Sequence, residues 1–150
     1  MLNEIYNKRI LELAADIPRL GRLSAPDGSA TAHSKLCGST VTVDLTLRDG
    51  AVSDFAHDVK ACALGQASSS IMARQVVGAT PEELRTVREA VRRMLKEAGE
   101  PPSGKWEDLR VLEPVRDFKA RHASTLLTFD AVVGAIEKAL AKEAPAAAEA

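Results

Sequence analysis

Aromatic residues and cysteines are scarce in this chain of 150 residues. Only 3% of the residues are aromatic, so Leu, Val, Ile and Ala have to fill the core. Two cysteines in a chain without a secretion signal are expected to be reduced rather than bridged. The length is that of one ordinary domain with a single core.

The chain also lacks a strong charge of one sign and a long apolar run. Its net charge of -1 argues against nucleic acid or a membrane surface as a partner. No run approaches the roughly 18 apolar residues of a spanning helix, and the charged start Met1–Ile5 is unlike a signal peptide. We therefore expect a cytoplasmic protein.

Apolar residues recur every three to four positions in several segments, and this periodicity predicts helices. Pro18 stops the first helix, and Thr80-Pro81-Glu82-Glu83 is a capping sequence that begins the third. The predicted helices cover residues 2–17, 62–77, 80–98 and 120–141, with one or two helical turns near 106–115. The third carries a basic face, which could dock an acidic partner but is more often simply solvated: Arg85, Arg88, Arg92, Arg93 and Lys96.

Strict alternation of apolar and polar residues over 40–48 predicts a half-buried strand. A second strand follows over 51–59, and a short edge strand is expected near Ala30–His33. Asp44 falls on the polar face, and we assign it no chemistry. Strands followed by helices indicate an α+β domain, with an N-terminal helix, two to three antiparallel strands, and three to four helices on one sheet face.

The register of the predicted hairpin bears on the two cysteines. A two-residue Asp49-Gly50 loop would mix apolar and polar faces, whereas a three-residue Arg48–Gly50 loop pairs Val43 with Phe55 and keeps the faces separate. That register places Cys37 opposite Ala61, and therefore close to Cys62, if the pairing continues so far.

Cys62 stands where a strand-like run ends and a run of small residues opens a helix. Small residues allow a close approach of backbone and ligand, and a helix N-terminus offers unpaired N–H groups with a partial positive charge. These features suit a reactive or metal-binding sulfur. The alternative is a buried cysteine that packs as a small apolar residue.

The segment Ala61–Ser70 resembles the Gly-Cys-x-x-(Ser/Ala)-x-Ala-Ser-Ser-Ser segment of the NifU N-terminal/IscU-like iron–sulfur cluster assembly scaffolds. Leu36–Ser39 is similar to their Cys-Gly-Asp loop. Residues 118–126 resemble the Phe-Pro-x-Arg-x-x-Cys-x-x-Leu segment of the SufU type, and residues 99–119 its insertion. The resemblance extends from about Leu2 to Leu140 and implies a SufE/NifU-like domain over 1–141. The composition of the Ala/Glu-rich tail at 142–150 predicts disorder.

Two family positions differ in this chain. Ser39 replaces the Asp of the Cys-Gly-Asp loop. In an ungapped alignment Ser124 replaces the third cysteine, whereas a one-residue shift puts His122 on the family's His and Ala123 on its Cys. The third cysteine is absent in both alignments, and Arg121 matches the Arg near it.

The resemblance implies a ligand set for zinc or a transient iron–sulfur cluster, formed by Cys37, Cys62 and His122. Imidazole can replace a thiolate at such centres. Auxiliary candidates are Ser39, Ser124, Arg121 and His33. Since the set is incomplete, an alternative is that no metal or cluster binds.

Three functions remain open. The first is an iron–sulfur assembly scaffold, or a sulfur-accepting relative, that is not an enzyme and works with a cysteine desulfurase and recipient proteins. A second subunit, as in a homodimer, could complete its metal shell. The second is a degenerate docking module of the same machinery. The third is a thiol redox protein that uses a reversible bond between Cys37 and Cys62.

Overall fold

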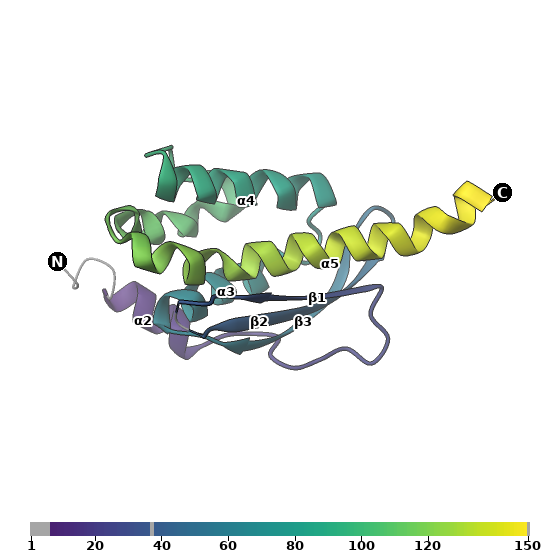
Figure 1. Ribbon diagram of the computed structural model, residues 1–150, viewed down its shortest axis with the longest axis horizontal. Coiled ribbons are helices and arrows are strands. Elements are labelled where there is room, and N and C mark those ends of the chain that lie inside the picture. Colours follow the sequence, from purple (N-terminus) through teal and green to yellow (C-terminus); the bar gives the residue numbers. More distant parts are fainter. Residues whose placement is uncertain (1–6, 37, 150) are drawn as a thin grey trace.

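The computed structural model describes residues 7–36 and 38–149, with side chains up to residue 142. Three strands in this part form one antiparallel sheet in the order β1-β2-β3, namely β1 (Gly28–His33), β2 (Thr40–Arg48) and β3 (Ala51–Lys60). The helices are α2 (Lys8–Ala15), α3 (Ala63–Gln75), α4 (Pro81–Lys96) and α5 (His122–Glu149), with 3-10 segments η1 (Gly104–Asp117) and η2 (Lys119–Arg121). The predicted α+β class and the expected edge strand are confirmed (Figure 1).

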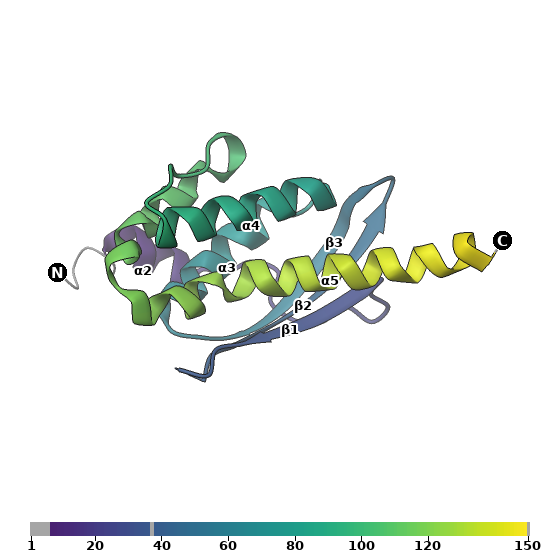
Figure 2. The same cartoon turned by 45° about the horizontal axis from the view of Figure 1, so that its top comes forward.

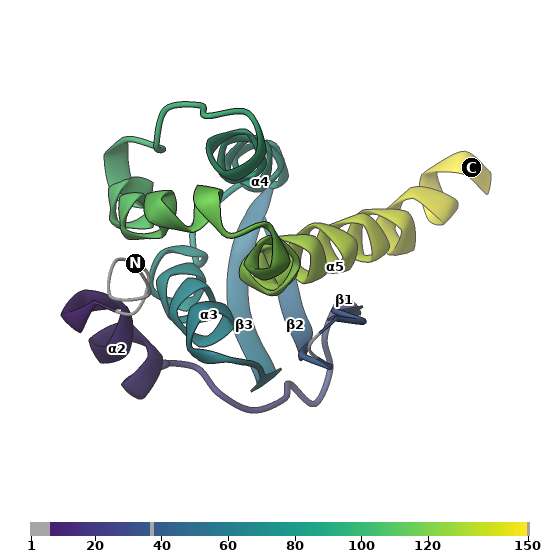
Figure 3. The same ribbon diagram turned by 60° about the vertical axis from the view of Figure 1, so that its left-hand side comes forward.

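The helices lie on one side of the sheet, as predicted. Helix α5 runs the length of the molecule over β1 and β2, and α3 packs beside it against β3 (Figures 1 and 3). Helix α4 lies alongside α5, and α2 packs against α3 (Figure 2). The core between these layers is aliphatic, with Phe55 and Phe129 as its largest fully buried side chains. The scarcity of aromatic residues therefore leaves most of the packing to Leu, Val, Ile and Ala.

Close backbone packing joins α5 to the edge strand. A Cβ atom at Gly28 would lie 2.0 Å from the Ala135 carbonyl oxygen, and one at Gly134 would lie 3.0 Å from the Ala30 Cβ. Glycine at these two positions lets the helix and the strand approach. These contacts hold the middle of α5 against β1, and the helix also packs against β2 (Figure 3).

The β2–β3 turn differs from the prediction. It has two residues, Asp49 and Gly50, both with positive φ as in a type I′ turn. The faces stay separate because of a bulge at Ser53 on β3, so that Thr46 pairs with Asp54 while Leu47 pairs with Val52. The predicted three-residue loop is therefore wrong, as is the predicted pairing of Val43 with Phe55. Val43 pairs with His57, and Leu45 pairs with Phe55.

The connection from α2 to β1 crosses the sheet face that the helices leave uncovered. Leu20 forms a parallel bridge with His57 of β3, and further along the backbone N–H of Leu23 donates to Asp44 of β2. Asp44 is thus buried, although the alternation of β2 predicts a polar, outward position. His57 is fully buried, in keeping with the structural role inferred from its alternation with apolar neighbours.

The helix boundaries follow local signals where these are strong. Thr80 caps α4 by accepting from the Glu83 N–H, and Pro81 occupies the first helical position. The apolar segment near 106–115 is longer than predicted, since η1 extends over Gly104–Asp117. Helix α5 continues past Lys142 into the Ala/Glu-rich segment, whose disorder stays a prediction.

Candidate functional site

Cys62 is the N-cap residue of α3 and is separated from the end of β3 by a single residue, Ala61. Its backbone is extended and its carbonyl accepts the first intrahelical bond, from Gln66. The side chain is partly exposed and makes no capping hydrogen bond, so the sulfur is directed to other partners. The sequence prediction of a strand–cysteine–helix junction is confirmed.

Ser124 of α5 lies next to this sulfur. The Cys62 Sγ donates to the Ser124 Oγ at 3.5 Å, and the Ser124 hydroxyl donates in turn to the Arg121 carbonyl at 3.2 Å. Ser124 is almost completely buried, while its neighbour Ala123 is exposed. The contact favours the ungapped alignment, because it is the Ser124 side chain that reaches Cys62.

Gly65 makes this contact sterically feasible. A Cβ atom at this position would lie 2.7 Å from the Ala61 Cβ and 3.2 Å from the Ser124 carbonyl oxygen. Since any larger residue would fill this space, Gly65 allows the first turn of α5 to pack closely against the first turn of α3. The glycine is therefore part of the architecture of the site rather than a turn residue.

His122 is buried at the start of α5. Its Nε2 is 3.0 Å from the Val115 carbonyl oxygen and 3.1 Å from that of Arg116. A ring nitrogen that donates to two carbonyls has no lone pair left for a metal. In this arrangement only Nδ1 could act as the predicted ligand, and the role of His122 as a ligand stays a prediction.

The other predicted residues come from the β1–β2 turn. His33 is exposed at the end of β1, opposite Thr40. Ser39 is buried, and its carbonyl accepts from the Ser34 N–H. Cys37 lies outside the described residues, so its distance from Cys62 and any bond between them stay predictions.

The sheet pairing nevertheless fixes where the two chain segments lie. Thr40 pairs with Lys60, the last residue of β3, so the start of β2 and Cys62 are at the same end of the sheet. Within the described part of the chain, no three His, Cys, Asp or Glu side chains come close enough together to hold a metal ion. A metal or cluster held at Cys62 by such side chains would therefore require ligands from outside the described residues, or from another chain.

The comparison with known families adds to this geometry. Residues 5–125 match the family described as NifU-like N terminal domain. The chain belongs to the NifU-like N-terminal domain family. The resemblance inferred from the Cys62 and Cys37 segments is thereby confirmed.

Relatives of this NifU-like domain cover nearly its whole length. It is similar to the iron–sulfur cluster assembly scaffold protein IscU of Thermotoga maritima, with 25% identity over 89% of this chain and 94% of that protein. The crystal structure of a nitrogen-fixing NifU-like protein (N-terminal) from Brucella abortus has 64% identity and a TM-score of 0.92, over 94% of this chain and 98% of that one. The SUF-system protein FiSufU of Fervidobacterium islandicum AW-1 shares the fold, with a TM-score of 0.79 and 19% identity over 86% of this chain and 94% of that one.

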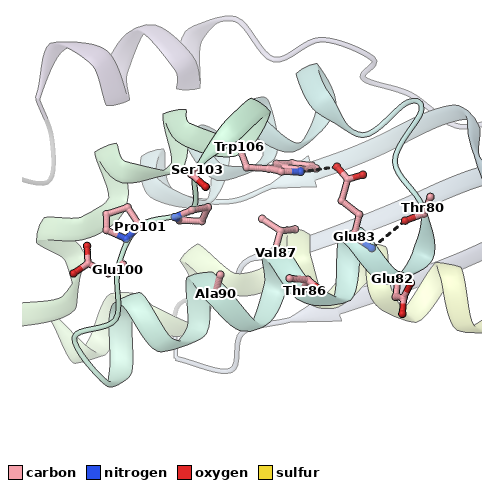
Figure 4. Close-up of a pocket in the computed structure, with 11 residues that line it drawn as sticks. Thr80, Glu82, Glu83, Thr86, Val87, Ala90, Glu100, Pro101, Ser103 and Trp106 are labelled. Carbon is pink, nitrogen blue, oxygen red and sulfur yellow. Dashed lines mark hydrogen bonds between the residues drawn. The ribbon is translucent and has the colours of Figure 1, made fainter.

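A groove of this NifU-like domain is lined by none of the residues around Cys62. It has a volume of about 540 Å³ and runs between α4 and the segment 100–106 (Figure 4). Trp106 closes one wall by donating its indole N–H to Glu83 at 2.8 Å. Burial acts to raise the pKa of Glu83, but hydrogen bonds from Trp106 and Lys105 outweigh it, so this pKa lies below its usual value. None of the predicted site residues lines the groove.

The basic face predicted on α4 is largely neutralised. Arg85 pairs with Glu137 and Arg88 with Asp130, which ties α4 to α5. The other two arginines pair with carboxylates on α4 or directly after it, Arg92 with Glu89 and Glu97, and Arg93 with Glu89. These pairs leave no free arginine cluster there for an acidic partner. None of the helices in the described part of the chain has the length and apolar character that crossing a bilayer requires.

Proposed function

We propose that this NifU-like domain serves iron–sulfur cluster assembly by accepting sulfur, or holding a labile cluster, at Cys62 together with Cys37. The observation that carries the proposal is the position of the Cys62 Sγ, 3.5 Å from the buried Ser124 hydroxyl and at the N-terminus of α3. The scaffold proteins among its relatives support the same assignment. The partners proposed are a cysteine desulfurase and recipient proteins in the cytoplasm, and the domain itself catalyses no reaction.

The donor set determines how tightly iron could be held. Thiolates are the usual ligands of zinc and of iron–sulfur clusters, and four ligands complete the shell. Ser124 offers a hydroxyl where a third thiolate would bind more strongly, and the His122 Nε2 is engaged by carbonyls. A cluster on this chain would therefore be weakly held, which suits a cargo that is passed on. A second copy of the chain could supply the missing ligand.

Anaerobic reconstitution tests the proposal. The protein is incubated either with iron and sulfide or with a cysteine desulfurase and its substrate L-cysteine, and visible absorption, bound metal and, in the second case, persulfide mass are measured. We expect bound sulfur or a visible chromophore in the wild type, and its loss in Cys62→Ala and in Cys37→Ala. Ser103→Ala, in the remote groove, is the matched control and should behave as the wild type. A wild type that takes up neither metal, cluster nor sulfur would contradict the proposal.

A docking module is the second candidate function. It is favoured by the engagement of His122 and by the lack, among the described residues, of three ligands in one place. Such a module would bind the desulfurase without carrying metal or sulfur. Co-purification of the desulfurase with a Cys37→Ser/Cys62→Ser variant, combined with a wild type that stays empty in reconstitution, would select it. Loss of binding in the double variant would instead link docking to the thiols.

A further inference from the structure

A small basic pocket lies between the end of α4 and the start of α5. It has a volume of about 200 Å³ and is lined by Leu95, Lys96, Arg116, Lys119 and His122. Among the described residues, no carboxylate lines it. The pocket thus gathers cationic side chains from three elements that are separated in the sequence, α4, η1 and η2.

Arg116 has an unfilled hydrogen-bonding position. Its Nη2 donates to the Gly99 carbonyl at 3.2 Å and to the Glu113 carboxylate at 3.1 Å. Its Nε is buried and has no acceptor in the described part of the chain. A buried N–H without an acceptor is costly, and such groups commonly mark the place of a missing water or ion.

The two lysines are not neutralised within the chain. All four arginines of α4 pair with carboxylates, whereas neither Lys96 nor Lys119 forms an ion pair with a residue that the structure describes. The guanidinium of Arg116 is partly balanced by Glu113. The pocket therefore retains the charge of two ammonium groups beside a donor without an acceptor.

We propose that this pocket binds a small oxyanion. The Arg116 guanidinium, which lines the pocket, would donate to one anion oxygen, and Lys96 and Lys119 would balance the charge of the anion. A volume of about 200 Å³ accommodates an anion of the size of phosphate but is below the usual range for larger organic ligands. Free phosphate and the carboxylate of a short acid offer the same oxygen chemistry, and the test separates them.

The site is distinct from the sulfur chemistry proposed above. His122 lines the pocket, and Ser124, two residues later in α5, contacts Cys62. An anion held here would stabilise the first turn of α5 without touching the thiol. Binding should therefore persist in a Cys37→Ser/Cys62→Ser variant, and this persistence separates the inference from the proposed function.

Phosphate titration followed by ¹H–¹⁵N NMR is the test, at constant ionic strength with chloride as the balancing anion. We expect saturable shifts of the Arg116 Nε–H and of the His122 amide. Lys119→Ala should weaken phosphate binding about fivefold, since it removes one unit charge close to the anion. Lys138→Ala, an exposed lysine on α5 outside the pocket, is the charge-matched control and should bind as the wild type.

Two further arms complete the test. Lys96→Ala repeats the charge removal from α4, and Arg116→Lys keeps the charge but removes the Nε–H, so both should weaken binding. Acetate should shift the same signals if any carboxylate suffices, and only phosphate should do so if the site requires a tetrahedral anion. Absence of saturation, or equal affinity in Lys119→Ala and Lys138→Ala, would overturn the proposal.

Discussion

Asp44 is a carboxylate with no exposed side-chain surface that is paired with a largely exposed arginine. It accepts from the Arg22 guanidinium at 2.6 Å, from the Ser29 hydroxyl and from the Leu23 N–H. Burial alone would raise the pKa of Asp44, but these hydrogen bonds outweigh it and lower the pKa below its usual value. They fasten the connection between α2 and β1 to the sheet.

We expect Asp44→Asn to lower the free energy of unfolding at pH 7 by about 2 kcal/mol, since hydrogen bonds to a charged group are lost. Because the folded-state pKa is lowered, the contribution is complete above about pH 4 and is lost as the pH falls through the folded-state pKa. Urea unfolding at pH 7 and pH 3 measures both effects. Asp108→Asn, in the exposed pair with Arg9, is the control and should cost less than about 1 kcal/mol. Equal costs at Asp44 and Asp108 would contradict the assigned role.

His57 also lowers stability on the acid side, but at a higher pH than Asp44. Burial lowers its pKa, more than the Pro18 carbonyl and the charge of Asp58 raise it, so the folded protein keeps the ring neutral. The unfolded chain binds a proton near pH 6.5, and stability therefore falls as the pH decreases from there towards the folded-state pKa. We expect His57→Gln to remove this slope between pH 7 and pH 5, and the exposed control His33→Gln to retain it. An unchanged slope in His57→Gln would disprove the assignment.

The environment of Asp44 also shows what periodicity misses at a single residue. The alternation of β2 gives the direction of its side chain correctly, since Val43 and Leu45 point into the core on the other face. The alternation does not predict that Asp44 is buried, because the residues that cover it, 22–29, have no repeating apolar pattern. A polar residue on an outward strand position is exposed only where nothing else in the chain crosses that face.

At the scale of elements, the packing of α3 against α5 depends on Gly65. Replacing glycine by alanine inside a helix usually stabilises it by up to about 1 kcal/mol. Here the new Cβ would lie 2.7 Å from the Ala61 Cβ, so we expect Gly65→Ala to destabilise the protein by about 1–3 kcal/mol. It should also move Ser124 away from Cys62 and change the rate of thiol modification, measured in a Cys37→Ser background.

A second-site change provides the control for Gly65. Ala61→Gly removes the nearest atom, so the double variant should recover part of the lost stability, while the contact with the Ser124 carbonyl remains. Urea unfolding of the single and double variants measures this recovery. If Gly65→Ala proved as stable as the wild type, the close approach of the two helices would not be what positions the site.

In the β2–β3 hairpin, the predicted separation of apolar and polar faces is correct, but the predicted length of the turn is wrong. The rule that apolar residues stay on one face correctly requires one extra residue in the hairpin, and the sequence prediction assigns that residue to the turn. The chain places it at Ser53 instead, since Asp49-Gly50 is a favourable type I′ pair and a bulge corrects the register. Patterning fixes which face a residue takes, but one extra residue can be absorbed at either place.

At the scale of the molecule, the architecture could be predicted because each element carries its own local signal. The caps of α4, the alternation of β2 and the apolar stripe of α5 each indicate one type of structure. The candidate site depends on contacts between residues 62 positions apart, such as Cys62 and Ser124, for which the sequence offers only an alignment with two solutions. The hydrogen bonds from His122 to two carbonyls of η1 cannot be predicted from a sequence pattern, because they depend on how η1 packs back against the start of α5.

Because Ser124 lies beside Cys62, replacing it by cysteine tests whether the molecule can gain a metal-binding site. Ser124→Cys places a thiol beside Cys62, and with Cys37 the chain would offer three thiolates to zinc. A ligand that binds only the folded state at 100 times its dissociation constant adds about 2.7 kcal/mol of stability, which in a domain of this size raises Tm by roughly 5–10 °C. We therefore expect zinc to raise the Tm of Ser124→Cys by that amount and a chelator to reverse the rise.

Ser103→Cys, which adds a thiol in the remote groove, should show no such rise. Equal responses of the two variants would mean that the start of α5 does not face a metal-binding position.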